Sequence, residues 1–144
     1  RVEQWVAEAA DAGAEVICGG KRLSNSCYAP TVLLNPPESC RVSTLEIFGP
    51  VIAVYEKQNL DEAISQANSL KFAFQASIFS NDYAEIMEAI NRLDASALMV
   101  NEHSAFRVDW MPFAGRKRSG LCVGGISHTI EEMSQSKMAV LSSN

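Results

Sequence analysis

Short apolar runs alternate with amphipathic stretches along the first hundred residues, and this alternation limits the possible folds more than any other feature of the chain. Apolar side chains three and four positions apart predict helices, whereas short runs rich in Val, Ile and Leu between Gly, Pro or Asn predict strands. The predicted strands are residues 15–18, 29–34, 51–55, 77–79 and 97–100. Strands that alternate with helices indicate an α/β fold, with a mostly parallel sheet and helices on both faces.

The predicted helices carry start and stop signals. The first has its apolar stripe at Val2, Trp5, Val6, Ala9 and Ala10, and Gly13 ends it. The second uses Leu60, Ala63, Ile64 and Ala67, with Asn59 and Glu62 as a reciprocal capping pair. The third buries Ile86, Ile90 and Leu93 and is capped by Asn81 or Asp82.

Residues 101–125 break this pattern, because they hold five Gly or Pro residues and show no periodicity. Long loops in α/β proteins usually carry functional sites. A short helix at 126–133 and an apolar strand at 137–141 follow the loop. An apolar edge strand at the end of a chain needs a partner, so we expect a homo-oligomer, a dimer or tetramer, that pairs through this strand.

Composition excludes several classes of function. The chain has 144 residues, of which 47% are hydrophobic, and a net charge of −5, which is typical of a soluble globular domain. An acidic chain repels nucleic acid, and the one basic cluster, residues 116–118, is interpreted as a solvated turn. The four cysteines lack metal-ligand spacing, and the sequence shows neither a signal peptide nor a membrane span. We therefore expect a cytoplasmic protein with free thiols, no metal and no membrane partner, and the initial Arg1 suggests a piece of a longer product.

Three segments carry a family resemblance. Leu45-Glu46-Ile47-Phe48-Gly49-Pro50-Val51 resembles the E-x-F-G-P-V signature of the NAD(P)-dependent aldehyde dehydrogenase superfamily. Residues 28–32 and 112–120 resemble two further motifs of that superfamily, in its order and at about its spacing. The resemblance implies that Glu46 accepts hydrogen bonds from the nicotinamide ribose of NAD or NADP and that Phe48 packs by the nicotinamide ring. Considered alone, such a pair would be an exposed loop acid and a strand-end core residue.

The same resemblance implies a reaction. An aldehyde is oxidised to a carboxylic acid by NAD(P)+ through a cysteine thioester, and a glutamate acts as general base. Both groups precede the Glu46 segment in the family, so no catalytic residue is expected in this chain, and Cys122 is interpreted as an incidental thiol. Residues 1–134 would then be the C-terminal part of the catalytic domain, and residues 135–144 the terminal strand of the oligomerisation element. The alternative is a non-catalytic assembly or nucleotide-contacting module of the same fold.

The loop supplies candidate contacts for the aldehyde. The resemblance implies that Phe113 lines the substrate tunnel, although it could instead pack under the loop. Residues 101–110 correspond to the family's variable substrate loop, so their roles are inferred from chemistry alone. Phe106, Arg107 and His103 are candidate substrate residues, and the two basic groups could hold an anionic tail, which predicts a small polar or anionic aldehyde. Alternatively, Arg107 pairs with Asp109 or Glu102 on the surface and His103 is solvated.

Overall fold

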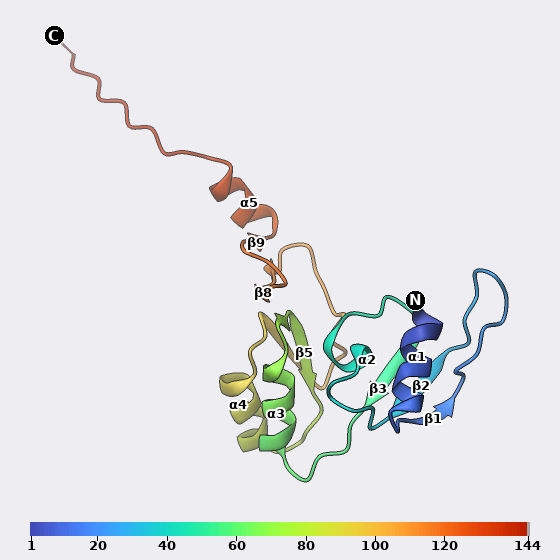
Figure 1. Ribbon diagram of the computed structural model, residues 1–144. Coiled ribbons are helices and arrows are strands. Elements are labelled where there is room, and N and C mark those ends of the chain that lie inside the picture. Colours follow the sequence, from blue (N-terminus) through green and yellow to red (C-terminus); the bar gives the residue numbers. More distant parts are fainter. Residues whose placement is uncertain (144) are drawn as a thin grey trace. The chain divides into compact units, whose positions relative to one another are not determined.

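The computed structural model describes residues 1–143 (Figure 1). The chain divides into two compact units, one formed by residues 1–62 and the other beginning at Ala63, and each is described by itself.

The first unit is a small three-stranded sheet with one long helix. Its elements are α1 (Val2–Asp11), β1 (Glu15–Cys18), β2 (Thr31–Leu34), α2 (Arg41–Thr44) and β3 (Val51–Val54). The strand order is β1-β2-β3, in which β1 pairs antiparallel with β2 and β2 pairs parallel with β3. Figure 1 shows α1 lying against this sheet, and Val6 and Ala9 of the helix share a buried cluster with Leu33 of β2.

The predicted stripe of the first helix is confirmed in its central part, where Trp5, Val6 and Ala9 are buried. The helix ends before Gly13, whose φ of 108° suits glycine. On the sheet face that does not carry the buried cluster, Ile52 and Val54 remain 63% and 41% exposed. Within the first unit, only one face of this sheet thus carries an apolar core.

The second unit holds the remaining elements, and α3 begins just before it. They are α3 (Leu60–Ser69), β4 (Phe72–Ala73), β5 (Gln75–Ile78), α4 (Tyr83–Arg92), β6 (Ala97–Val100), β7 (Phe113–Ala114), β8 (Arg116–Lys117), β9 (Val123–Gly124) and α5 (Ile126–Glu132). β5 and β6 pair in parallel, whereas β4–β8 and β7–β9 are short antiparallel pairs. Figure 1 shows α3 and α4 next to each other, and the side-chain amide of Asn68 donates to the carbonyl of Arg92, which joins their C-terminal ends.

Side-chain caps set the starts of α3 and α4. Asn59 Oδ1 accepts a bond of 2.9 Å from the backbone N–H of Glu62, as predicted. The Glu62 carboxylate accepts from the backbone of Gln58, so the reciprocal bond falls one residue earlier than a regular capping box places it. Of the two candidates for the α4 cap, Asp82 is the one that accepts backbone bonds, from Ala84 and Glu85.

Three expectations need correction or refinement. The α/β class is confirmed, but the described strands form four small sheets, with two parallel and three antiparallel pairings, so one mostly parallel sheet is not seen within this chain. The expectation that α4 buries Ile90 is wrong, because Ala89 is the buried residue and Ile90 is 44% exposed. The loop at 101–125 contains the unpredicted strands β7, β8 and β9.

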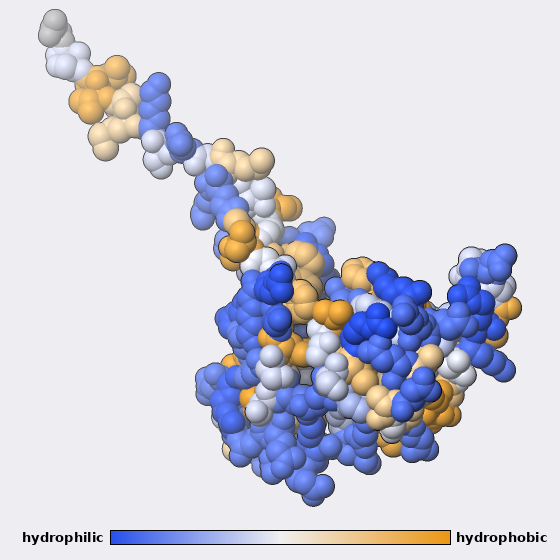
Figure 2. Space-filling model, viewed as in Figure 1, coloured by the Kyte–Doolittle hydropathy of each residue, from blue (hydrophilic) through white to orange (hydrophobic). Residues whose placement is uncertain are grey.

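Among residues 1–143, the predicted strand at 137–141 forms no strand pairing. Its apolar side chains are exposed, with Met138, Val140 and Leu141 at 85–94%, and Figure 2 shows hydrophobic atoms along this segment. Strand pairing with another chain stays a prediction, and Asn144, the last residue of the predicted oligomerisation element, lies outside the described residues. In the part of the chain that the structure describes, no helix combines the length and the apolar character needed to cross a membrane.

Candidate cofactor and substrate sites

The segment between α2 and β3 presents the predicted cofactor pair to solvent. Ile47 packs against the core cluster, whereas its neighbours Glu46 and Phe48 are exposed, the phenylalanine by 74%. Phe48 has a φ of 48°, in the left-handed region that non-glycine residues seldom occupy. Phe48 is therefore not part of the core that the described residues form. An exposed ring in a strained backbone conformation is a feature that clusters at binding sites.

The Gly49-Pro50 corner fixes the end of this segment. A Cβ atom added to Gly49 would lie 2.6 Å from Val2 Cγ2, so a larger residue here would require the Val2 side chain to shift. The Pro50 carbonyl accepts a bond of 2.8 Å from the backbone N–H of Thr31 at the start of β2. Glu46 and Phe48 thus project from a segment whose following turn is tied to both the helix and the sheet.

In the second unit, an arginine lies over an aromatic ring. The Arg107 guanidinium carbon is 4.2 Å from the centroid of the Phe113 ring, a cation–π contact. The Phe74 ring meets Phe113 edge-on, with centroids 4.8 Å apart and an interplanar angle of 84°. Among residues 1–143, Arg107 forms no ion pair, so the alternative pairing with Asp109 or Glu102 is not found. The guanidinium keeps its hydrogen-bond donors for a ligand or solvent.

The other two candidate substrate residues make different contacts from Arg107. His103 Nε2 lies 3.5 Å from Glu102 Oε1, and both side chains are more than half exposed. Phe106 lines a hollow of about 390 Å³ beside β6. Arg107 lines a different open groove of about 650 Å³, whose apolar wall is Ile126, Ile130 and Met133. No contact between His103 and Arg107 is found among residues 1–143, and the pairing of the two around one anion stays a prediction.

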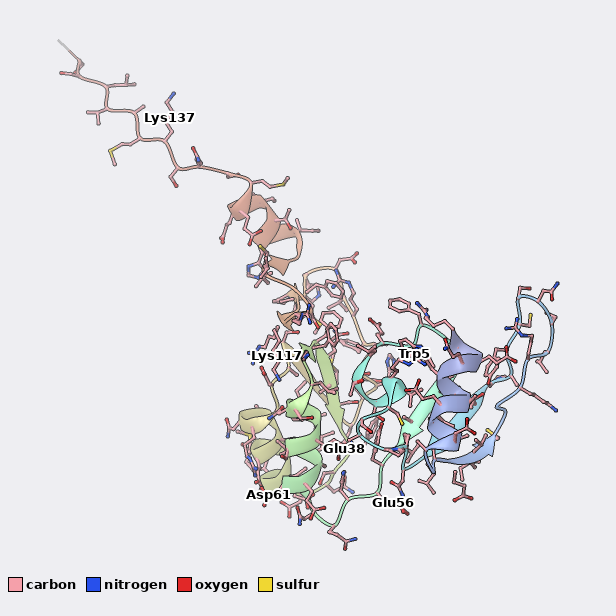
Figure 3. All side chains as sticks on the ribbon, in the orientation of Figure 1. Trp5, Glu38, Glu56, Asp61, Lys117 and Lys137 are labelled. Carbon is pink, nitrogen blue, oxygen red and sulfur yellow. The ribbon has the colours of Figure 1, made fainter. Side chains whose placement is uncertain are left out.

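Sequence reasoning missed a polar cluster that holds the hairpin of residues 113–124, in which β7 pairs with β9 and β8 lies between them in the chain. Lys117 Nζ donates to the carbonyls of Asn68 (2.7 Å) and Leu70 (3.1 Å) and lies 3.0 Å from Asp94 Oδ2, so three partners surround one ammonium. Figure 3 shows Lys117 at the C-terminal end of α3, where the helix dipole favours a positive charge. The hydrogen bond from Lys117, with a further one from Arg116, holds the pKa of the Asp94 carboxyl below its usual value. The basic cluster at 116–118 is thus more than a solvated turn.

The side chain of Asn68 closes this cluster. Its Nδ2 donates to the Arg92 carbonyl and its Oδ1 accepts from the Asp94 backbone, both at 2.8 Å, so it bridges the ends of α3 and α4. The partners of Lys117 lie more than 20 residues away along the chain, where no local pattern could indicate them. The one hint of this cluster in the sequence was the position of Lys117 between the glycines of its motif.

The backbone of the hairpin is packed tightly. A Cβ atom on Gly115 would lie 2.4 Å from the carbonyl carbon of Ser119 and 2.6 Å from the backbone nitrogen of Gly120. Ser119 Oγ accepts a bond of 3.1 Å from the backbone of Ala73, which joins the hairpin to β4. Cys122 is an exposed free thiol, and residues 1–143 contain no group of three or more potential metal ligands.

The model of the aldehyde dehydrogenase family matches residues 1–139, so the chain belongs to that family.

Three relatives illustrate the match. The chain is 40% identical over 141 residues to a 3-sulfolactaldehyde dehydrogenase of Priestia megaterium, covering 98% of this chain and 29% of the relative. It is 39% identical over 141 residues to a lactaldehyde dehydrogenase of Methanococcus maripaludis, covering 98% and 30%. The crystal structure of a glyceraldehyde-3-phosphate dehydrogenase of Methanocaldococcus jannaschii in complex with NADP superposes with a TM-score of 0.86 at 35% identity, covering 93% and 29%. The chain therefore spans less than a third of the length of these relatives.

Proposed function

We propose that this chain is the C-terminal part of the catalytic domain of an aldehyde dehydrogenase that oxidises an aldehyde to a carboxylic acid with NAD(P)+. The catalytic cysteine, which forms the thioester, and the glutamate base belong to segments that precede this chain in the longer protein. The exposed Glu46 and Phe48 pair is the single observation that carries the proposal, since the pair has the form that a dinucleotide contact needs. A neighbouring segment supplies the remaining dinucleotide contacts.

The residues present fit a nicotinamide ribose. The Glu46 carboxylate has no hydrogen-bond or ion-pair partner among residues 1–143, and an ionised carboxylate is an acceptor that can take two hydroxyl donors at once. The Phe48 ring, which is exposed, offers a flat apolar surface against which the nicotinamide ring can pack. NAD or NADP supplies hydride acceptance when bound, and these two residues bind and orient it.

We propose that the substrate is a small polar or anionic aldehyde held by Arg107 and Phe113. Arg107 carries a positive charge that no carboxylate of residues 1–143 neutralises. The Phe113 ring packs against its guanidinium and would also form an apolar wall for the substrate. Two of the relatives are named for aldehydes that carry a sulfonate or a phosphate, and the third for a neutral one. Phe106 and His103 remain predicted substrate contacts without such support.

In the longer protein, we further propose a mostly parallel sheet with helices on both faces that includes the parallel pairs β2–β3 and β5–β6. Ile52 and Val54, exposed on one face of the first sheet, would be covered there. Residues 135–144 would form the terminal strand through which two or four copies assemble, which would bury Met138, Val140 and Leu141.

A dehydrogenase assay of the longer protein tests the proposed function. With a panel of small aldehydes and either cofactor, reduction of NAD+ or NADP+ should be followed at 340 nm and the acid product identified. The isolated chain is expected to be inactive, since the nucleophile lies outside it. A longer protein that binds the cofactor but oxidises no aldehyde would contradict the proposal.

Replacing Arg107 with alanine in the longer protein should selectively lower kcat/KM for anionic substrates. A charge-assisted hydrogen bond is worth about 1.5–3 kcal/mol, so kcat/KM for aldehydes that carry a sulfonate, phosphate or carboxylate should fall by about 10- to 100-fold. For lactaldehyde the loss should stay below about threefold, because an uncharged substrate lacks the partner of the guanidinium.

Arg118→Ala is the matched control, since Arg118 is an exposed arginine of the same unit and makes no ion pair among residues 1–143. It should leave both classes of substrate unchanged. An equal loss for neutral and anionic aldehydes in Arg107→Ala would remove the proposed substrate class.

A further inference from the structure

The first half of α1 contacts the segment that carries Glu46 and Phe48 at several points. Arg1 Nη2 donates a bond of 3.0 Å to the carbonyl oxygen of Ile47, the residue between the proposed cofactor contacts. The Val2 side chain fills the space at Gly49, as described above. One helix therefore holds both the middle and the end of this segment.

A second arginine holds the start of the segment. Arg41, the first residue of α2, donates from Nε to Glu8 Oε2 (2.6 Å) and from its backbone nitrogen to Glu8 Oε1 (3.2 Å), and the two side chains form an ion pair. These bonds hold the pKa of the Glu8 carboxyl below its usual value, so the carboxyl is ionised at neutral pH. The Arg41 carbonyl in turn accepts from the backbone of Leu45, directly before Glu46.

The two arginines share one aromatic residue. Trp5 is buried, with 8% of its surface exposed, and its ring centroid lies 5.8 Å from the guanidinium carbon of Arg1 and 5.3 Å from that of Arg41. Such cation–π contacts restrict two otherwise flexible side chains. Trp5 is itself fixed in the helix, so both arginines are held on a rigid base.

We propose that Arg1 and Arg41, held by Trp5 and Glu8 of α1, are positioning residues for the cofactor contact made by Glu46 and Phe48. This inference rests on the proposed function. A left-handed backbone at Phe48 persists only where its surroundings determine it strongly, and the Ile47 carbonyl is the adjacent point of attachment. Releasing that carbonyl lets the backbone relax, which misplaces the flanking side chains and weakens dinucleotide binding.

The test uses the longer protein, with KM for the cofactor, kcat and thermal midpoint measured for each variant. Arg1→Met keeps an apolar stem near Trp5 but removes the donor to Ile47, so KM for the cofactor should rise by about fivefold, the effect of one lost hydrogen bond, while kcat changes by less than about twofold. Arg1→Lys keeps a charged donor and should recover most of the affinity. Arg22→Met is the matched control, because Arg22 pairs with Glu3 of the same helix and not with residues 41–49.

Glu46→Gln separates the two proposals. If it raises KM for the cofactor and Arg1→Met lowers only the thermal midpoint, the positioning role is overturned and the cofactor contact stands. If Glu46→Gln has no effect, the contact itself fails and the inference fails with it. Should Arg1→Met not fold, Glu8→Gln, which removes the charge that holds Arg41, gives the same comparison: a raised KM supports the positioning role and an unchanged KM overturns it.

Discussion

Replacing Glu46 with glutamine in the longer protein is expected to raise KM for NAD(P)+ by about 10- to 100-fold. Glutamine has nearly the same shape, but it carries no charge and turns one acceptor oxygen into a donor that faces a ribose hydroxyl. Hydrogen bonds to charged groups are worth about 1.5–3 kcal/mol, which corresponds to that range of affinity. Stability should not change, because the carboxylate is exposed and has no partner among residues 1–143.

Initial rates at saturating aldehyde, with the cofactor varied, give this value directly. Glu15→Gln is the control, since Glu15 is another exposed acid of the first unit and lies on β1. It should leave KM for the cofactor within about 1.5-fold, because an exposed charge outside the Glu46 segment is screened by salt and its loss has little effect. Equal KM values for the wild-type protein and Glu46→Gln would contradict the proposed ribose contact.

Replacing Gly115 with alanine should destabilise the hairpin by about 3 kcal/mol, at the upper end of the cost of overpacking. The new methyl group would lie 2.4 Å from the carbonyl carbon of Ser119, a backbone atom of a residue that the bond from Ala73 to Ser119 Oγ holds in place. Strands β7 and β8 would have to separate from the turn at Ser119, which displaces Phe113 and Arg107 as well. We expect the thermal midpoint to fall by about 10 °C for a chain of this size.

Gly120→Ala is the graded comparison, because its Cβ would lie 3.3 Å from Gly115, a distance that a small shift relieves. Circular dichroism melts of both variants should rank Gly115→Ala as clearly the less stable. If the two variants melt at the same temperature, close backbone approach at Gly115 does not determine the stability of the hairpin.

Elements with a strong local pattern could be predicted from the sequence. The helix at 2–11 has a clear apolar stripe, and the strand at 97–100 is a short apolar run between turn residues, and both were found as predicted. The pairs β4–β8 and β7–β9 could not be predicted, because each contains only two residues per strand. Their pairing depends on partners distant in the chain rather than on a repeating pattern.

The same distinction applies to the candidate sites. The motif around Glu46 and Phe48 indicated two exposed ligands, but the left-handed backbone at Phe48 and the bond from Arg1 to Ile47 depend on tertiary contacts. For Arg107, charge alone suggested a carboxylate partner, and the structure instead places the guanidinium over an aromatic ring six residues further on. A backbone angle leaves no repeating pattern in the sequence, and neither does the choice between two possible partners of a side chain. Neither feature can therefore be predicted from periodicity.

The division into two compact units has an evolutionary consequence. The acid and ring proposed to bind the dinucleotide belong to the first unit, and the loop proposed to bind the aldehyde belongs to the second. Mutations in residues 101–113 can therefore be selected for new aldehydes without altering the hydrogen bonds that support Glu46 and Phe48. Related proteins could thus keep one way of binding the coenzyme while the aldehyde that they oxidise changes.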